Sequence, residues 1–392
     1  MKIAMLGCKG IPATQGGIEH HVQELSTRMV EMGHDVTVYC RPYYTTTDKT
    51  HYKGVRLRKL PTVPTKSLDA IVATFFATMD AMVEGYDLVH YHAIGPATLS
   101  VLTRMAGENT VVTVHGLDWQ REKWGKPARL FLKFGERAAV MFPYNTIAVS
   151  KFLKKHLEDK YERPVVYIPS ATTEPVLREP DKIKQYGLRG GDYILFLARL
   201  VPEKGAHFLI DAYKKLDTNL KLVIAGGASH SGDYVAGLKK SASDRVIFTD
   251  FVYEETVQEL YSNAYCYVQP STIEGLPITL IEAVAYGNCI IASDIPACIE
   301  VVEDSGVIFE SRNVDALAEA LKKVIENPDL ARKLGAKAKA RGVAEYNYDR
   351  VAEKTIALYQ SVLAERERRS PPVGRALGDM SDMAPFAKSS PL

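Results

Sequence analysis

The chain has 392 residues, 46% of them hydrophobic and 24% charged, with a formal net charge of +2. This composition is typical of a globular protein long enough for two domains, and the near-neutral charge argues against a nucleic-acid partner. The five cysteines lack the close spacing of zinc or redox motifs, and no apolar run is long enough for a signal peptide or a membrane span. We therefore expect a cytoplasmic protein, and any contact with the inner face of the membrane should be peripheral.

Strand-like apolar runs alternate with helical segments along the first half, which predicts an α/β fold with a parallel sheet. Helices are expected at residues 17–32 and 67–83. The predicted strands are residues 2–6, 35–40, 55–60, 88–92, 110–115, 146–149 and 165–168.

A second series of strands begins at Tyr193, after a polar, proline-bearing stretch at 170–190 that we interpret as a linker. Its predicted strands are residues 193–198, 222–225, 246–248, 266–269 and 289–292, and helices are expected at 313–326, 328–340 and 349–368. The expected domains are therefore residues 1–169 and 191–345, with a further helix at 346–368. Residues 369–392 are rich in proline and serine and are predicted to be disordered.

The most informative segment is STIEGLPITLIEAVAYG at 271–287, in which Glu274 and Glu282 flank a loop that becomes a helix. Gly275 allows close approach of the backbone to a ligand, and Pro277 suits the start of a helix. The helix N-terminus favours an anion such as a phosphate, whereas the two carboxylates should bind neutral hydroxyls. A nucleotide sugar offers both kinds of group.

The cations for such a ligand lie in GDYILFLARLVPEKG, where a buried strand from Tyr193 is followed by Arg199 and Lys204. Ligands of open α/β sheets bind beyond the carboxyl ends of the strands. Arg199 and Lys204 are therefore expected to neutralise a diphosphate.

These motifs, with the glycine loop GCKGIPATQGGIEHHV, resemble those of the retaining glycosyltransferases of family 4, whose GT-B fold has two Rossmann-like domains facing a central cleft. GIPATQGGIE and HGLDWQREKWG are similar to a bacterial subgroup that includes rhamnosyltransferases of surface polysaccharide synthesis. The resemblance covers about residues 1–365 and implies that the last helix crosses back onto the amino-terminal domain.

The resemblance also implies a role for each matching residue. Glu274 would contact the donor sugar and Glu282 the ribose, while Arg199 and Lys204 would hold the diphosphate. The substrate would further be contacted by Gly16 and Gly17 of the glycine loop, by Gly275 and Leu276, and by His115 at the end of a strand. His92 has a similar strand-end position with a weaker match.

The implied reaction moves a sugar from a nucleoside diphosphate to a glycan or lipid-linked acceptor. The chain has no Asp-x-Asp motif, so neither a metal nor another cofactor is expected. A nucleotide-sugar epimerase or hydrolase and a non-catalytic nucleotide-sugar-binding subunit remain alternatives. An NAD-dependent oxidoreductase is disfavoured because the glycine fingerprint is missing.

Residues 121–163 carry eleven Lys or Arg against five Asp or Glu, near the aromatic residues Trp119, Trp124, Phe131 and Phe134. One interpretation is a solvated basic face over ordinary core aromatics, and the other is contact with an anionic inner membrane.

Two departures from the family pattern are Ser170-Ala171 in place of Asn-Gly and Asp250 in place of a glycine near the expected base pocket.

Overall fold

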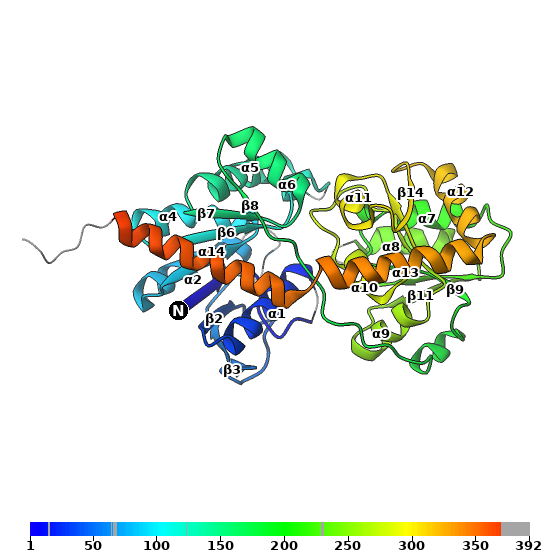
Figure 1. Cartoon of the computed structure of the whole chain (residues 1–392), viewed down its shortest axis with the longest axis horizontal. Coiled ribbons are helices and arrows are strands. Elements are labelled where there is room, and N and C mark those ends of the chain that lie inside the picture. Colours follow the sequence, from blue (N-terminus) through cyan, green and yellow to red (C-terminus); the bar gives the residue numbers. More distant parts are fainter. Residues whose placement is uncertain (15, 64, 66–68, 123, 229–230, 370–392) are drawn as a thin grey trace, which may run out of the picture.

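The computed structural model describes residues 1–14, 16–63, 65, 69–122, 124–228 and 231–369. The predicted disordered tail at 369–392 lies outside them except for Arg369, which ends a helix. The molecule has two α/β halves, each built on its own sheet (Figure 1). The prediction of two parallel sheets is confirmed.

The first half contains an eight-stranded sheet in the order β3-β4-β2-β1-β5-β6-β7-β8, parallel except for the β3–β4 pair. Strands such as β5 and β6 are buried along their whole length because helices cover both faces of the sheet. The strands are β1 Lys2–Leu6, β2 Asp35–Cys40, β3 His51–Tyr52, β4 Val55–Lys59, β5 Leu88–His92, β6 Thr110–Val114, β7 Asn145–Ala148 and β8 Val166–Tyr167. The helices are α1 Gly17–Glu31, α2 Asp69–Glu84, α3 Ile94–Ala97, α4 Ser100–Met105, α5 Lys126–Met141 and α6 Lys151–Tyr161, with a 3-10 turn at Asp118–Gln120.

The second half contains a six-stranded parallel sheet in the order β11-β10-β9-β12-β13-β14. Its strands are β9 Tyr193–Leu197, β10 Lys221–Ala225, β11 Val246–Asp250, β12 Cys266–Gln269, β13 Ile290–Ser293 and β14 Gly306–Phe309. Its helices are α7 Ala206–Tyr213, α8 Gly232–Ser241, α9 Glu254–Ser262, α10 Ile278–Tyr286, α11 Pro296–Val302, α12 Val314–Ile325 and α13 Pro328–Glu345, with 3-10 turns at Lys182–Tyr186 and Pro202–Lys204.

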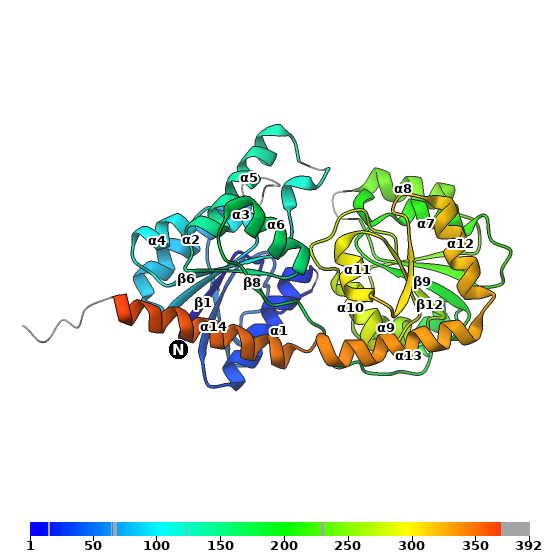
Figure 2. The same cartoon turned by 45° about the horizontal axis from the view of Figure 1, so that its top comes forward.

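The last helix, α14 Tyr348–Arg369, leaves the second half and packs on the first (Figures 1 and 2). Asp349 pairs with Arg28 of α1 at 2.7 Å, and the Tyr359 hydroxyl lies 2.5 Å from His90 Nδ1 in β5. The apolar face of α14 buries Val351, Ala352, Ile356 and Val362. The first half is thus completed by residues from the far end of the sequence.

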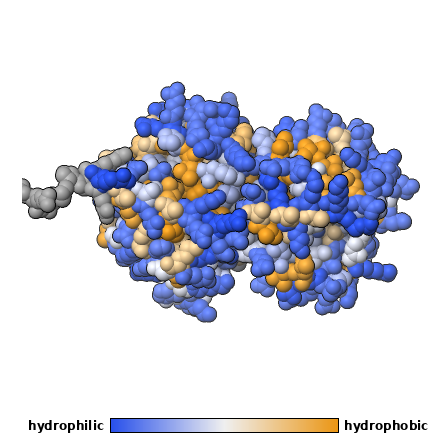
Figure 3. Space-filling view, viewed as in Figure 1, coloured by the Kyte–Doolittle hydropathy of each residue, from blue (hydrophilic) through white to orange (hydrophobic). Residues whose placement is uncertain are grey.

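No helix in the described part of the chain combines the length and apolar character needed to cross a bilayer. The face seen in Figure 3 is mostly hydrophilic, with apolar residues in separate patches over both halves.

Candidate active site

Each sheet has a point at which the strand order reverses direction, and most of the predicted site residues lie at these two points, while His115 follows the neighbouring strand β6. In the second half, β9 and β12 are neighbours, so the loops after them leave the sheet side by side. Arg199 and Lys204 follow β9, and Glu274 follows β12. In the first half the reversal lies between β1 and β5, where the glycine loop and His92 leave the sheet. Such crevices are the usual ligand sites of open α/β folds.

Glu274 is held by three donors on one carboxylate oxygen. Its Oε1 accepts hydrogen bonds from Lys204 Nζ at 2.5 Å, Ser271 Oγ at 2.8 Å and Gln269 Nε2 at 3.0 Å. The side chains of Glu274 and Lys204 are only 9% and 15% exposed, so this ion pair is largely desolvated. Sequence reasoning assigned Lys204 to a phosphate and Glu274 to a hydroxyl, but in the structure the two groups bind each other.

The loops that carry this pair are joined by backbone contacts. Gly205 adopts a φ of +74°, and a Cβ there would lie 2.1 Å from the carbonyl oxygen of Pro270. The amide of Thr272 donates to the carbonyl of Glu203 at 2.9 Å. The loops after β9 and β12 therefore form one rigid unit.

Arg199 is the cation that remains available at this point. It has no ion pair with any described residue at 4.0 Å or less, and it is partly buried. Burial lowers its pKa, Arg121 of the first half lowers it further, and Glu274, Glu203 and Glu19 oppose the shift. The Arg199 guanidinium is desolvated and lies near the guanidinium of Arg121, and such a pair of cations is well suited to an anionic ligand.

Arg121 is a residue that sequence reasoning did not single out. It is 3.0 Å from Asp118, which raises its pKa, and the more distant carboxylates Glu203 and Glu274 add to the shift. The only sequence signal was its position in HGLDWQREKWG, the loop that follows β6. Polar loops contain many charged residues, so the sequence does not distinguish Arg121 from its neighbours. Its role becomes visible only when the second half is placed against this loop.

Glu282 lies in the middle of α10 with its carboxylate 2.9 Å from the Tyr261 hydroxyl. Burial raises the pKa of Glu282 to about 7, and the hydrogen bond from Tyr261 opposes the shift. A carboxylate with this environment gains from further hydroxyl donors, because each one offsets the cost of burying its charge.

The two halves touch at the predicted site. A Cβ on Gly275 would lie 1.8 Å from the carbonyl oxygen of His115, and a Cβ on Gly17 would lie 3.0 Å from Ile278 Cδ1. Gly275 therefore packs its backbone directly on the end of β6, whereas its predicted contact with a ligand stays a prediction. Leu276 beside it is 7% exposed and belongs to the hydrophobic core, and its predicted contact with a substrate also stays a prediction.

The glycine loop is fixed by side chains of α1. Gly16 has a φ of +101°, and a Cβ there would lie 2.1 Å from Glu19 Oε2. Glu19 also accepts a hydrogen bond from the Lys9 amide at 3.0 Å, and Gln23 accepts one from the Ala13 amide at 2.8 Å. The loop is thus preorganised where α1 begins.

His115 directly follows β6 and lies beside His92, with 3.1 Å between His115 Nε2 and His92 Nδ1. Burial lowers the pKa of both imidazoles well below the usual value, and neighbouring histidines add to the effect. Both rings are therefore neutral at pH 7.

The basic segment divides into a structural part and a surface part. Glu136 is fully buried and is bound by Lys160 at 2.7 Å, Tyr161 at 3.0 Å and Trp119, so this part is an internal network. Trp119, Trp124 and Phe131 are partly buried against the hydrophobic core, as the first interpretation expected, whereas Phe134 is 50% exposed. A groove beside Glu274 is lined by Trp119, Gln120, Arg129, Lys133, Thr272 and Ile273.

Asp250, which stands where the family pattern has a glycine, adopts a φ of +55° and pairs with Lys239 at 3.2 Å. The left-handed backbone explains the preference for glycine, and Asp is among the residues that tolerate this conformation.

Residues 15–172 match the family described as Glycosyltransferase Family 4, and residues 179–341 match Glycosyl transferases group 1. The chain is 27% identical to an uncharacterised glycosyltransferase of Methanocaldococcus jannaschii, over 92% of this chain and 98% of the relative. It is 25% identical to the GDP-mannose-dependent α-(1-6)-phosphatidylinositol monomannoside mannosyltransferase of Mycobacterium tuberculosis, over 90% and 97%.

Among solved structures, the sucrose-phosphate synthase of Thermosynechococcus elongatus is similar with a TM-score of 0.81 and 22% identity, covering 93% of this chain and 99% of that one. The Anabaena protein HepE, solved with UDP and glucose, is similar with a TM-score of 0.77 and 19% identity, covering 92% and 100%. These likenesses confirm the GT-B fold.

Proposed function

Because the chain is a group 1 glycosyltransferase with the GT-B fold, we propose that it transfers a sugar, with retention and without a metal, from a nucleoside diphosphate to a glycan or lipid-linked acceptor. The observation that carries the proposal is Arg199, a desolvated arginine without an ion pair among the described residues, at the strand-order reversal between β9 and β12. A diphosphate is the anion that fits it.

The proposed donor lies across this reversal point. Glu282 holds the ribose hydroxyls, and Arg199 binds the diphosphate. Gly16 and Gly17, at the N-terminus of α1, approach the phosphates from the first half. HepE, with the same fold, was solved with UDP and glucose, which supports a nucleotide-sugar donor here.

Lys204 has two states in this proposal. Without a donor it pairs with Glu274, and on donor binding the diphosphate competes for its ammonium group while a sugar hydroxyl donates to Glu274. Arg199 and Lys204 then stabilise the charge that develops on the leaving diphosphate, which is the role a metal has in other transferases. His115, neutral at pH 7, contacts the sugar. Retention follows from attack on the leaving-group face, with the departing phosphate accepting the acceptor's proton.

The groove beside Glu274 is proposed to hold the acceptor. The Lys133 ammonium lies 5.1 Å from the centre of the Trp119 ring, and neither Lys133 nor Arg129 has an ion pair within the described part of the chain. An aromatic ring with flanking cations suits a sugar that carries a phosphate, as a lipid-linked acceptor does.

We also propose that α5 contacts an anionic membrane. Its outward face combines the cations Arg129, Lys133 and Arg137 with Leu130 and Phe134, which are 72% and 50% exposed. Liposome flotation tests this contact: the protein should float with anionic vesicles and not with neutral ones, and failure to float with either removes the proposal.

Initial rates with a panel of rhamnosyl, glucosyl and mannosyl nucleotides test the reaction, with the anomeric configuration of the product read by NMR. Rhamnose and a role in surface polysaccharide synthesis are proposed on the subgroup resemblance alone. Free sugar or an epimerised donor, formed without dependence on acceptor, would instead support the hydrolase or epimerase.

A further inference from the structure

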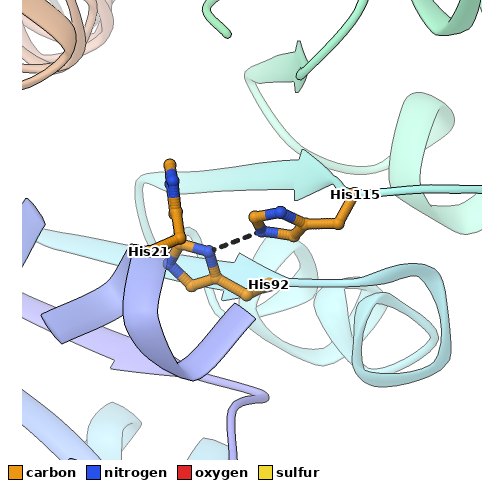
Figure 4. Close-up of side chains that lie close together, drawn as sticks. All are labelled: His21, His92 and His115. Carbon is orange, nitrogen blue, oxygen red and sulfur yellow. Dashed lines mark hydrogen bonds between the residues drawn. The ribbon is translucent and has the colours of Figure 1, made fainter. Parts of the chain in front are cut away.

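Three histidines from three elements meet beside the cleft. His21 comes from α1, His92 ends β5, and His115 follows β6 (Figure 4). One ring nitrogen from each lies within 4.8 Å of the other two. The ring centre of His21 is 5.0 Å from that of His115 and 5.8 Å from that of His92. The group is therefore compact enough to surround one small ligand.

Two nitrogens in this group have no partner. His21 and His92 are 3% and 0% exposed, and neither His21 Nδ1 nor His92 Nε2 forms a hydrogen bond with any described residue. Buried polar atoms are almost always satisfied by protein, water or an ion. A fourth histidine nearby, His90, differs because its two nitrogens are bound by Tyr359 and Thr113 at 2.5 and 2.7 Å. Among these four histidines the unpaired atoms are thus His21 Nδ1, which is free to bind an ion, and His92 Nε2, which would carry the proton of that ring when Nδ1 binds the ion.

The chemistry of the group fits a transition metal. Three imidazoles with one open position are the ligand set of catalytic zinc sites, and imidazole favours Zn²⁺, Co²⁺ or Ni²⁺ over Mg²⁺ or Ca²⁺. Tetrahedral zinc with nitrogens at about 2.05 Å separates the ligand atoms by about 3.3 Å. His92 Nδ1 and His115 Nε2 are already 3.1 Å apart, so the ion would replace the proton they share, and His21 would close in from α1.

We propose that His21, His92 and His115 bind one zinc-class ion, and that this ion inhibits sugar transfer by taking His115 away from the donor. The binding is independent of the proposed function, whereas the inhibition rests on it.

Binding is tested on the full chain after treatment with a chelator, by titration with Co²⁺ followed in the visible spectrum and by calorimetry with Zn²⁺. We expect one ion per chain, the intense visible bands of four-coordinate cobalt, and a dissociation constant of about 1 µM or below. His21→Gln should weaken binding at least tenfold. His51→Gln is the control, because His51 is exposed on β3 and should bind as the wild type does.

The wild-type titration alone can overturn the site, whether or not the variant folds. An absence of stoichiometric binding, a His21→Gln variant that binds equally well, or an equal loss in His51→Gln each refutes it. Circular dichroism and thermal unfolding check the fold of both variants.

Transfer rates measured across the same Zn²⁺ series should fall with the midpoint of the binding curve. Zinc that binds at the site without slowing transfer refutes the inhibition. A chain that binds zinc but transfers no sugar from any donor in its metal-free form would refute the proposed function and leave the site standing.

Discussion

Gly275→Ala tests whether activity requires the contact between the two halves. The new Cβ would lie 1.8 Å from the His115 carbonyl oxygen, 2.7 Å from its carbon and 2.9 Å from Gly116 Cα. An ordinary contact is about 3.4 Å or more, so the segments must separate by about 1.5 Å. Gly275 is not among the residues with positive φ, so alanine fits the backbone and the perturbation is steric. A misplacement of about 1 Å can cost about a hundredfold in rate, equivalent to ~2.7 kcal/mol.

The assay is the initial rate of transfer with the best donor, together with donor affinity and thermal unfolding. We expect kcat/KM to fall about a hundredfold while the melting temperature changes little, because the contact lies between the halves and outside their cores. Gly116→Ala is the matched control, since its Cβ would meet Gly275 Cα at 3.6 Å, an ordinary contact. Near-normal turnover in Gly275→Ala, or an equal loss in Gly116→Ala, would refute the reasoning. A loss confined to donor affinity would instead indicate the predicted ligand contact of Gly275.

Three further predictions concern the charged groups. Lys204→Ala and Glu274→Ala should each lower turnover at least tenfold, ~1.4 kcal/mol or more, and near-normal turnover in either variant removes that residue from the mechanism. In urea unfolding, the losses of unfolding free energy in the two single variants should add up to more than the loss in the double variant, because each single variant leaves the partner's charge buried and unpaired. Equality of the sum and the double-variant loss would show that the pair is not coupled. The pKa of Glu282 is raised to about 7, so its ionised form gains population as pH rises, and donor affinity should be about tenfold stronger at pH 8 than at pH 6. Glu282→Gln should bind more weakly and show no such pH dependence, and an identical profile in both proteins would rule out the ribose contact.

The same carboxyl has an opposite effect on stability. Its folded pKa lies above the unfolded value of 4.5, so the folded protein binds the extra proton, and stability from this group is lost as pH rises from about 4.5 to 7. At higher pH, the ribose hydroxyls of a bound donor would offset the cost of burying the Glu282 charge.

The fold was largely predictable because buried parallel strands are continuous apolar runs. The predicted strands at 2–6 and 266–269 agree with β1 and β12 at both ends. The two strands missed, β3 and β14, lie at sheet edges, and β3 has only two residues. The helix predicted at 328–340 continues to Glu345 because Gly342 packs on the backbone of Ala285, a tertiary contact that overrides the weak helix propensity of glycine.

The candidate site was predictable only in part. Residues next to a strand end, such as Arg199 and His115, follow from the rule that ligands bind at the carboxyl edge. Arg121 and His21 belong to a loop and a helix, and their roles depend on how the halves and the helix α1 are placed. The pairing of Lys204 with Glu274 joins residues 70 positions apart, which spacing along the chain does not reveal.

The path of α14 has a practical consequence for dividing this protein into fragments. A fragment ending near residue 169 would lack Val351, Ile356 and Tyr359, and would leave their partners on α1 and β5 exposed to water. Expression of the first half alone should therefore require residues 348–369, supplied as a separate peptide or fused by circular permutation.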